Sequence, residues 1–307
     1  MAYVDKTALV ARIVSLSAER GYFVNRPPKF GKTVLLDTIA TYFKGNREAF
    51  RGLAIYDMQM PWEEFPIIRF SMNDGKAELG KEIEEILASF YGVLRSSSSE
   101  GYVRFCYVTG NTKPVKSTLT SSLNDLSSID GTSPELSTLC GFTRDEILST
   151  FGPELSEFAK KVGKGEDEAM KDIEDNYSGY NWHLFGDKAG LVFNPYAILF
   201  VFKCMAICAY SVEEFLMPEW LRNLLKQYKS EIASIIGGSV RKYGRPQSII
   251  ELLQSPDLNS VRLIMWEYGL LTADFTSADN AGKCRFPNDK VSSVVWEVIQ
   301  ESLWLII

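Results

Sequence analysis

The chain has 307 residues, of which 46% are hydrophobic and 23% are charged, and its formal net charge is −6. This size and composition predict a globular protein that buries a full core and has room for two domains. The negative charge argues against nucleic acid as a partner, because non-specific binding to it needs a broad basic surface, although a local patch stays open.

The termini, cysteines and apolar runs favour an intracellular, cytoplasmic protein, with the nucleus left open. The first residues lack the charged-then-apolar order of a signal peptide. The five cysteines are scattered and odd in number, as expected of reduced thiols. The apolar run from Leu191 to Tyr210 is broken by Pro195 and Lys203. It is therefore expected to form a buried helix, too short to span a membrane.

The strongest local signal is a strand, a loop and a helix near the N-terminus. Tyr22–Val24 is apolar and β-prone, and predicts a buried strand that ends at Asn25. From Thr33, apolar residues recur at helical spacing until Gly45 stops the helix. Exposed backbone N–H groups and the positive end of the helix dipole meet at Gly31-Lys32-Thr33. The pattern indicates an anion-binding site.

The residue types at this junction are those of a phosphate-binding loop. Gly31 lets the backbone approach a phosphate, Lys32 is expected to reach the β- and γ-phosphates, and the Thr33 hydroxyl is expected to ligate Mg²⁺. The full motif has a glycine five positions before Gly31, where this chain has Arg26. We favour nucleotide binding over an ordinary turn because the strand–loop–helix context agrees with the motif.

Residues 26–33, Arg-Pro-Pro-Lys-Phe-Gly-Lys-Thr, resemble the RPRRFGKS-type loop of the AAA-ATPase-like family. Other segments resemble the family's motifs in the family's order: Tyr3–Thr7, Phe65–Ser71, Thr109–Lys113, Leu123–Leu126, Thr138–Thr143, Tyr177–Tyr180, Phe193–Tyr196 and Phe286–Asn288. The resemblance implies a P-loop ATPase core that uses ATP and Mg²⁺. The candidate phosphate-binding set is Lys29, Phe30, Gly31, Lys32 and Thr33, with a solvated loop charge as the alternative for Lys29.

The acidic strand of such an ATPase is missing from its expected place. The family has an LIDEYD-like, Walker B-like segment between its second strand and the strand leading to Thr109. Here those strands are predicted at Ile67–Ser71 and Tyr102–Thr109. The acidic pair between them, Glu84-Glu85, falls on the solvated face of a predicted helix. Hydrolysis is therefore expected to be weak or absent. Evolutionary loss and an imperfect gene model are both open explanations.

Two further polar residues are candidates for sensing the γ-phosphate. Thr109 and Asn111 follow a predicted strand, where this fold class places such a residue. A simple turn at Gly110 explains the same pattern equally well.

The second half of the sequence is mostly helical. The charged run 160–167 predicts a linker, and helices are expected near 195–210, 212–235, 246–254 and 258–268. A hairpin at 270–275 and 283–286 and a last helix from residue 288 follow. We predict an α/β fold: a P-loop NTPase parallel sheet flanked by helices over 1–162, then a helical lid and winged-helix-like region over 163–307.

Two functions stay open. The first is an ATP-binding AAA-ATPase-like protein, a candidate ATPase with impaired turnover. The second is a degenerate pseudo-ATPase that serves as an interaction scaffold. In the C-terminal half, Arg262 is opposed by Glu267 on the candidate recognition helix, which favours a protein partner or self-association over DNA. The nuclease domain common in the family is expected to be absent, and with it nuclease activity.

Overall fold

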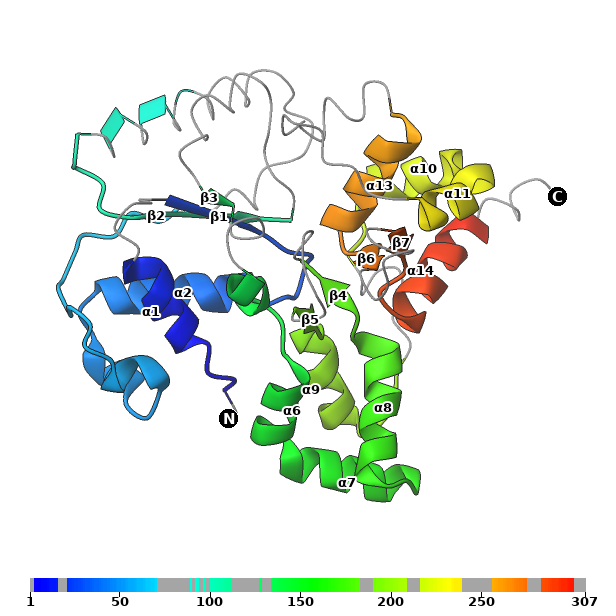
Figure 1. Cartoon of the computed structure of the whole chain (residues 1–307), viewed down its shortest axis with the longest axis horizontal. Coiled ribbons are helices and arrows are strands. Elements are labelled where there is room, and N and C mark those ends of the chain that lie inside the picture. Colours follow the sequence, from blue (N-terminus) through cyan, green and yellow to red (C-terminus); the bar gives the residue numbers. More distant parts are fainter. Residues whose placement is uncertain are drawn as a thin grey trace.

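The structure is a computed structural model that describes residues 3–15, 21–70, 89, 92–93, 96–97, 100–111, 127–128, 134–182, 190–208, 216–238, 256–274 and 283–300 (Figure 1). It mixes helices with small sheets. The first α-helices among the described residues are α1 (Thr7–Ser15), α2 (Lys32–Phe43), α6 (Arg144–Thr150), α7 (Gly152–Val162) and α8 (Glu166–Tyr177). They are followed by α9 (Pro195–Cys204), α10 (Glu219–Gln227), α11 (Ile232–Gly237), α13 (Leu258–Glu267) and α14 (Asp289–Gln300).

A small parallel sheet lies in the N-terminal half. Strand β1 (Gly21–Asn25) pairs with β2 (Cys106–Gly110) on one side and with β3 (Ser127–Ser128) on the other, parallel to both. Every residue of β1 is buried, and α1 and α2 lie against one face of the sheet (Figure 1). The buried faces of β1 and the two helices form one hydrophobic cluster. The sequence prediction of a strand ending at Asn25, followed by a helix, is confirmed.

The predicted second strand, Ile67–Ser71, is wrong over the residues that the structure describes. Residues 66–70 form no strand, and the side chains of Ile68 and Phe70 are 80% and 62% exposed. Pro66 has no N–H to donate to a ladder, which disfavours a paired strand at this point. The strand predicted at Tyr102–Thr109 is shorter and displaced, because β2 begins only at Cys106. The acidic pair Glu84-Glu85 lies outside the described residues.

Helices α6 to α9 bury a second hydrophobic cluster. The run predicted as a linker, 160–167, forms the end of α7 and a tight turn into α8, with Gly163 in the left-handed conformation. The domain boundary at 162/163 stays a prediction. Helix α9 ends at Cys204 rather than near residue 210, because Met205 adopts a left-handed conformation (φ 50°). It is only partly buried, since Tyr196 and Leu199 are exposed.

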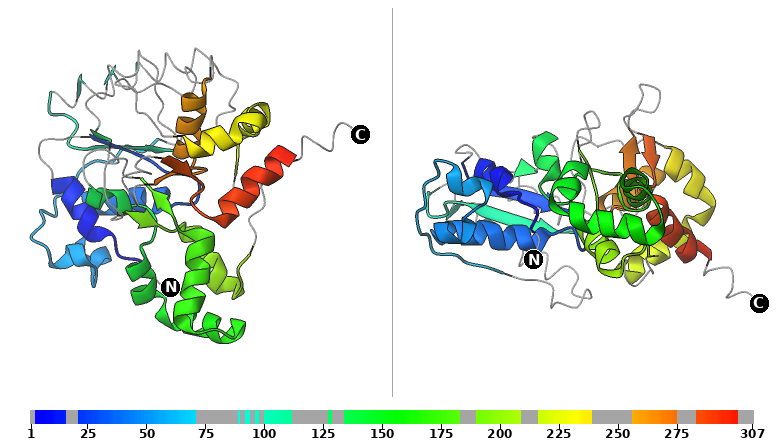
Figure 2. Two further views of the ribbon diagram at one scale, coloured as in Figure 1. Left: turned by 45° about the vertical axis from the view of Figure 1, so that its right-hand side comes forward. Right: turned by 90° about the horizontal axis from the view of Figure 1, so that it is seen from below.

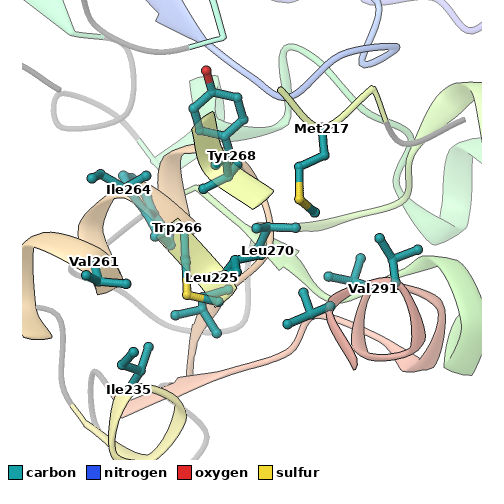
Figure 3. Close-up of a cluster of buried hydrophobic side chains, with 14 of the residues drawn as sticks. Met217, Leu225, Ile235, Val261, Ile264, Trp266, Tyr268, Leu270 and Val291 are labelled. Atoms are coloured by element: carbon teal, nitrogen blue, oxygen red, sulfur yellow. The ribbon is translucent and has the colours of Figure 1, made fainter. Parts of the chain in front are cut away.

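The C-terminal half is built around the largest cluster, shown in part in Figure 3. Helices α10, α11, α13 and α14 surround an antiparallel hairpin of β6 (Thr272–Asp274) and β7 (Lys283–Arg285). The predicted hairpin is confirmed. The single helix predicted at 212–235 is wrong, because Pro218 caps α10 and a 3₁₀ turn at Lys229–Glu231 separates α10 from α11. The helix predicted at 246–254 lies outside the described residues.

The C-terminal helices lie beside the parallel sheet and not on the face that α1 and α2 cover, as the views in Figures 1 and 2 agree. Within the described ranges, none of the helices combines the length and apolar character that a membrane span requires.

One glycine joins the middle of the chain to its C-terminal helix. Gly179 has a φ of 91°, and a Cβ there would lie 2.0 Å from the carbonyl oxygen of Pro287. Beside it, the Asn288 side chain donates a hydrogen bond to the Ser178 carbonyl (2.7 Å) and accepts one from the amide of Val291 (3.1 Å). The segment before β4 (Tyr180–Asn181) and the start of α14 are therefore in direct backbone contact.

Replacing Gly179 by alanine is expected to destabilise the fold by on the order of 3 kcal/mol, because it adds backbone strain and a steric clash. The measurement is the free energy of unfolding in denaturant. Gly237→Ala is the matched control, since a Cβ there meets nothing within 4 Å. Equal stabilities of the two variants would contradict the close contact between Gly179 and Pro287.

Candidate phosphate-binding site

The candidate phosphate loop, residues 26–33, runs from the end of β1 into the first turn of α2. The carboxyl ends of parallel strands meet at one edge of a sheet, so the residues that follow β2 come to lie beside this loop. The amide of Arg26 donates to the carbonyl of Gly110 (3.2 Å), and Asn111 comes next in the chain. The sheet therefore joins two regions that the sequence analysis singled out separately.

Backbone donors are available at the start of α2. Gly31 is the residue before the helix, and its φ of 84° is one that few residues other than glycine adopt. A Cβ at Gly31 would meet nothing within 4 Å, so the space next to it is open. Within the described part of the chain, the amides of Lys32, Thr33 and Val34 donate no hydrogen bond. Such amides at the positive end of a helix dipole favour an anion.

The side chain of Lys32 is directed back into the loop. Its Nζ donates to the carbonyls of Arg26 and Pro27 (both 2.7 Å) and to Oδ1 of Asn111 (2.9 Å). Burial lowers the pKa of Lys32 to about 8; Cys140 acts against this shift, and the nearby charge of Arg26 adds to it. These three acceptors are neutral oxygens, so the ammonium group has no buried counter-charge among them.

Arg26, which stands where the full motif has glycine, is part of the interior. It is 0% exposed, and its guanidinium donates to the carbonyls of Asn25 (2.7 Å) and Ser137 (3.1 Å). The guanidinium carbon also lies 4.9 Å from the ring centroid of Trp182, a distance typical of a cation–π contact. The Arg26 side chain therefore anchors the start of the loop in the interior, which a glycine at this position could not do.

The two other predicted residues of the loop face the C-terminal half. The ring of Phe30 is buried in the C-terminal cluster, and the residue as a whole is 1% exposed. Lys29 has a φ of 66°, and its Nζ lies 4.0 Å from the ring centroid of Tyr196, in the first turn of α9. The Lys29 ammonium thus contacts an aromatic ring and is not simply a solvated charge.

The remaining candidates occupy different positions. Asn111 contacts Lys32 directly, as a γ-phosphate sensor would have to. The Thr109 hydroxyl instead donates to the carbonyl of Val24 within the sheet (2.8 Å). Thr33 is exposed at the start of α2, and within the described residues its hydroxyl makes no hydrogen bond. The site thus brings together Gly31, Lys32, Thr33 and Asn111.

One residue that the sequence analysis did not single out, Trp182, contacts the candidate phosphate loop. Trp182 contacts both Arg26 and Phe30, although nothing local in the sequence marks it.

Lys6 forms an ion pair with Glu146 (2.6 Å). Burial lowers the pKa of Lys6, and Glu146 opposes that shift. Asp5 accepts a hydrogen bond from the amide of Ala54 (2.7 Å). The N-terminal motif at residues 3–7 thus has structural contacts.

Comparison with known proteins finds a family similarity in the region that contains this site. Residues 1–88 match the AAA-ATPase_like family, described as predicted AAA-ATPase. The N-terminal region, which contains the whole candidate phosphate loop, is therefore similar to this family. No solved structure matches the chain.

A curated relative extends the similarity over nearly the whole chain. It is an uncharacterized protein in the vnfD 5′ region of Azotobacter chroococcum mcd 1, 24% identical over 367 residues. The alignment covers 97% of this chain but 66% of the relative, so the chain spans less than two thirds of that protein. The alignment is longer than the 307 residues of the chain, and so must open gaps in it.

The depressed pKa of Lys32 predicts that phosphate binding at this site depends on pH. In the free protein Lys32 is expected to lose its proton as the pH rises through about 8. The uncharged amine cannot attract phosphate, so the affinity for ATP should fall several-fold between about pH 7.5 and about pH 9. Titration calorimetry across this range is the measurement.

Lys32→Arg is the control, because arginine stays charged throughout. A fall in affinity that is equally steep in this variant would place the titrating group elsewhere.

Proposed function

We propose that this protein binds Mg-ATP through a P-loop at Gly31-Lys32-Thr33 and hydrolyses it weakly or not at all. One observation carries the proposal: a partly buried lysine whose acceptors are all neutral lies at the start of α2, where the first amides donate no hydrogen bond within the described residues. Bringing a phosphate oxygen to this lysine replaces neutral acceptors with a charged one, which gives a stronger hydrogen bond.

Different residues of the site bind different parts of the triphosphate. The amides at the start of α2 bind phosphate oxygens, and Lys32 turns from the loop carbonyls to the β- and γ-phosphates. The exposed Thr33 hydroxyl would hold Mg²⁺, which would offset the negative charge of the phosphates. Asn111, already a partner of Lys32, takes the sensor role; Thr109 is the weaker candidate, because its hydroxyl is bound within the sheet.

We expect weak hydrolysis because the described residues place no acid beside the site. No carboxylate is among the groups that shift the pKa of Lys32, and no described residue supplies an acidic strand beside β2. A water-orienting acid is what P-loop ATPases use to activate the nucleophile. The alignment with the relative opens gaps in this chain, and such gaps agree with the loss of a segment such as the acidic strand.

The wider organisation belongs to the same proposal. Residues 1–162 form the P-loop NTPase-like core, and residues 163–307 form a helical lid with a winged-helix-like hairpin. The C-terminal half is where we place a protein partner or a second copy of the chain. A cytoplasmic location suits a nucleotide-binding protein of this kind.

The first test is ATP affinity, measured by titration calorimetry with Mg²⁺. Lys32→Ala is expected to weaken binding by roughly 10- to 100-fold, since it removes a charge-assisted hydrogen bond. Lys44→Ala is the matched control: Lys44 is exposed at the opposite end of α2 and should leave the affinity unchanged. Absence of binding in the wild type would refute the proposal and favour a pseudo-ATPase scaffold.

The second test is turnover. Phosphate release from Mg-ATP by the wild-type protein is expected to stay near that of Lys32→Ala. Robust turnover that disappears in Lys32→Ala would show that an acid outside the described residues completes the site.

A further inference from the structure

The candidate phosphate loop contacts the C-terminal half at four of its residues. Arg26 lies against Trp182, and a Cβ on Gly269 would be 2.5 Å from Cγ of Pro27. Lys29 covers Tyr196. These contacts join the loop to the C-terminal half of the chain.

Phe30 makes the deepest of these contacts. It is 1% exposed and belongs to the C-terminal cluster, whose other members among the described residues run from Tyr180 onward. Its ring meets those of Tyr180 and Trp182 edge-on, with centroids 4.9 and 5.7 Å away. The core of the C-terminal half (Figure 3) is therefore completed by a residue of the loop.

The loop needs such support because its own conformation is strained. Lys29 and Gly31 both have positive φ, and for a lysine this is an uncommon conformation that costs free energy. Strain of this kind persists only where the surroundings hold it. Trp182 is the residue best placed to do so, since it contacts the loop at Arg26 and at Phe30.

We propose that Trp182 is a positioning residue that holds the candidate phosphate loop in its binding conformation and couples ATP binding to order in the C-terminal cluster. The coupling is reciprocal: a ligand that fixes the loop also fixes Phe30 in its site, and loosening that site weakens the ligand. The ATP-dependent part rests on the proposed function. The positioning of the loop does not.

Two tryptophans of the same cluster provide a matched test. Trp182 and Trp266 are both buried, with ring centroids 6.0 Å apart. Trp266, in α13, donates its Nε1 hydrogen to the carbonyl of Asn181 (3.3 Å) and makes no ring contact with the loop. Trp182→Phe and Trp266→Phe each replace one buried ring of this cluster by a smaller one, but only the ring of Trp182 contacts the loop. The two variants should therefore act differently on the loop.

The first readout needs no ligand. Amide hydrogen exchange in residues 26–35 is expected to be faster in Trp182→Phe than in the wild type, and unchanged in Trp266→Phe. Phe30→Leu changes the same contact from the loop side and should behave like Trp182→Phe, which keeps the test decisive if one variant does not fold. Equal exchange of the loop in both tryptophan variants would overturn the positioning role.

The second readout uses Mg-ATP. We expect ATP to slow amide exchange in α13 of the wild type, and its affinity to fall roughly fivefold to tenfold in Trp182→Phe, the loss of one aromatic contact. Trp266→Phe should stay within about twofold of the wild type. If ATP binds but leaves α13 unaffected, the coupling is wrong. If the wild type does not bind ATP, the proposed function fails, while the ligand-free readout still decides the role of Trp182.

Discussion

The packing of Arg26 and Phe30 on Trp182 is the contact on which the arrangement of the site depends. β1 and α2 would form from local pattern alone, but the turn between them contains strained residues and a buried cation. Side chains from the second half of the chain hold that turn from outside. The amides at the start of α2, which donate no hydrogen bond within the described residues, and the side chain of Lys32 are the groups that we propose bind the ligand.

The segments that resemble family motifs meet one another in pairs. Gly141 and Phe142 lie against Val192 and Phe193, and Gly179 lies against Pro287. These are close backbone approaches that tolerate little change, so they build the scaffold around the site. The candidate phosphate-binding residues lie on the candidate phosphate loop and directly after β2.

The sequence predicted β1, α2 and the hairpin correctly because each is specified by local pattern and turn residues. It was wrong at residues 67–70, where apolar residues are exposed, because no local signal reveals whether a strand finds a partner. The break at Pro218 could have been predicted, since proline is disfavoured within a helix. The contact between Lys32 and Asn111 follows from strand order, and that between Arg26 and Trp182 from long-range packing. Neither leaves a mark in the local sequence.

The place of Phe30 in the C-terminal cluster also affects the order in which the parts of the chain can fold. The cluster includes Val298. A ribosome that adds about 5–20 residues per second needs tens of seconds to pass from Phe30 to Val298. Until then the nascent chain has β1 and α2 but no completed site for the Phe30 ring. An early element of the chain thus becomes one of the last to reach its final form, and its folding is governed by contacts of long sequence separation.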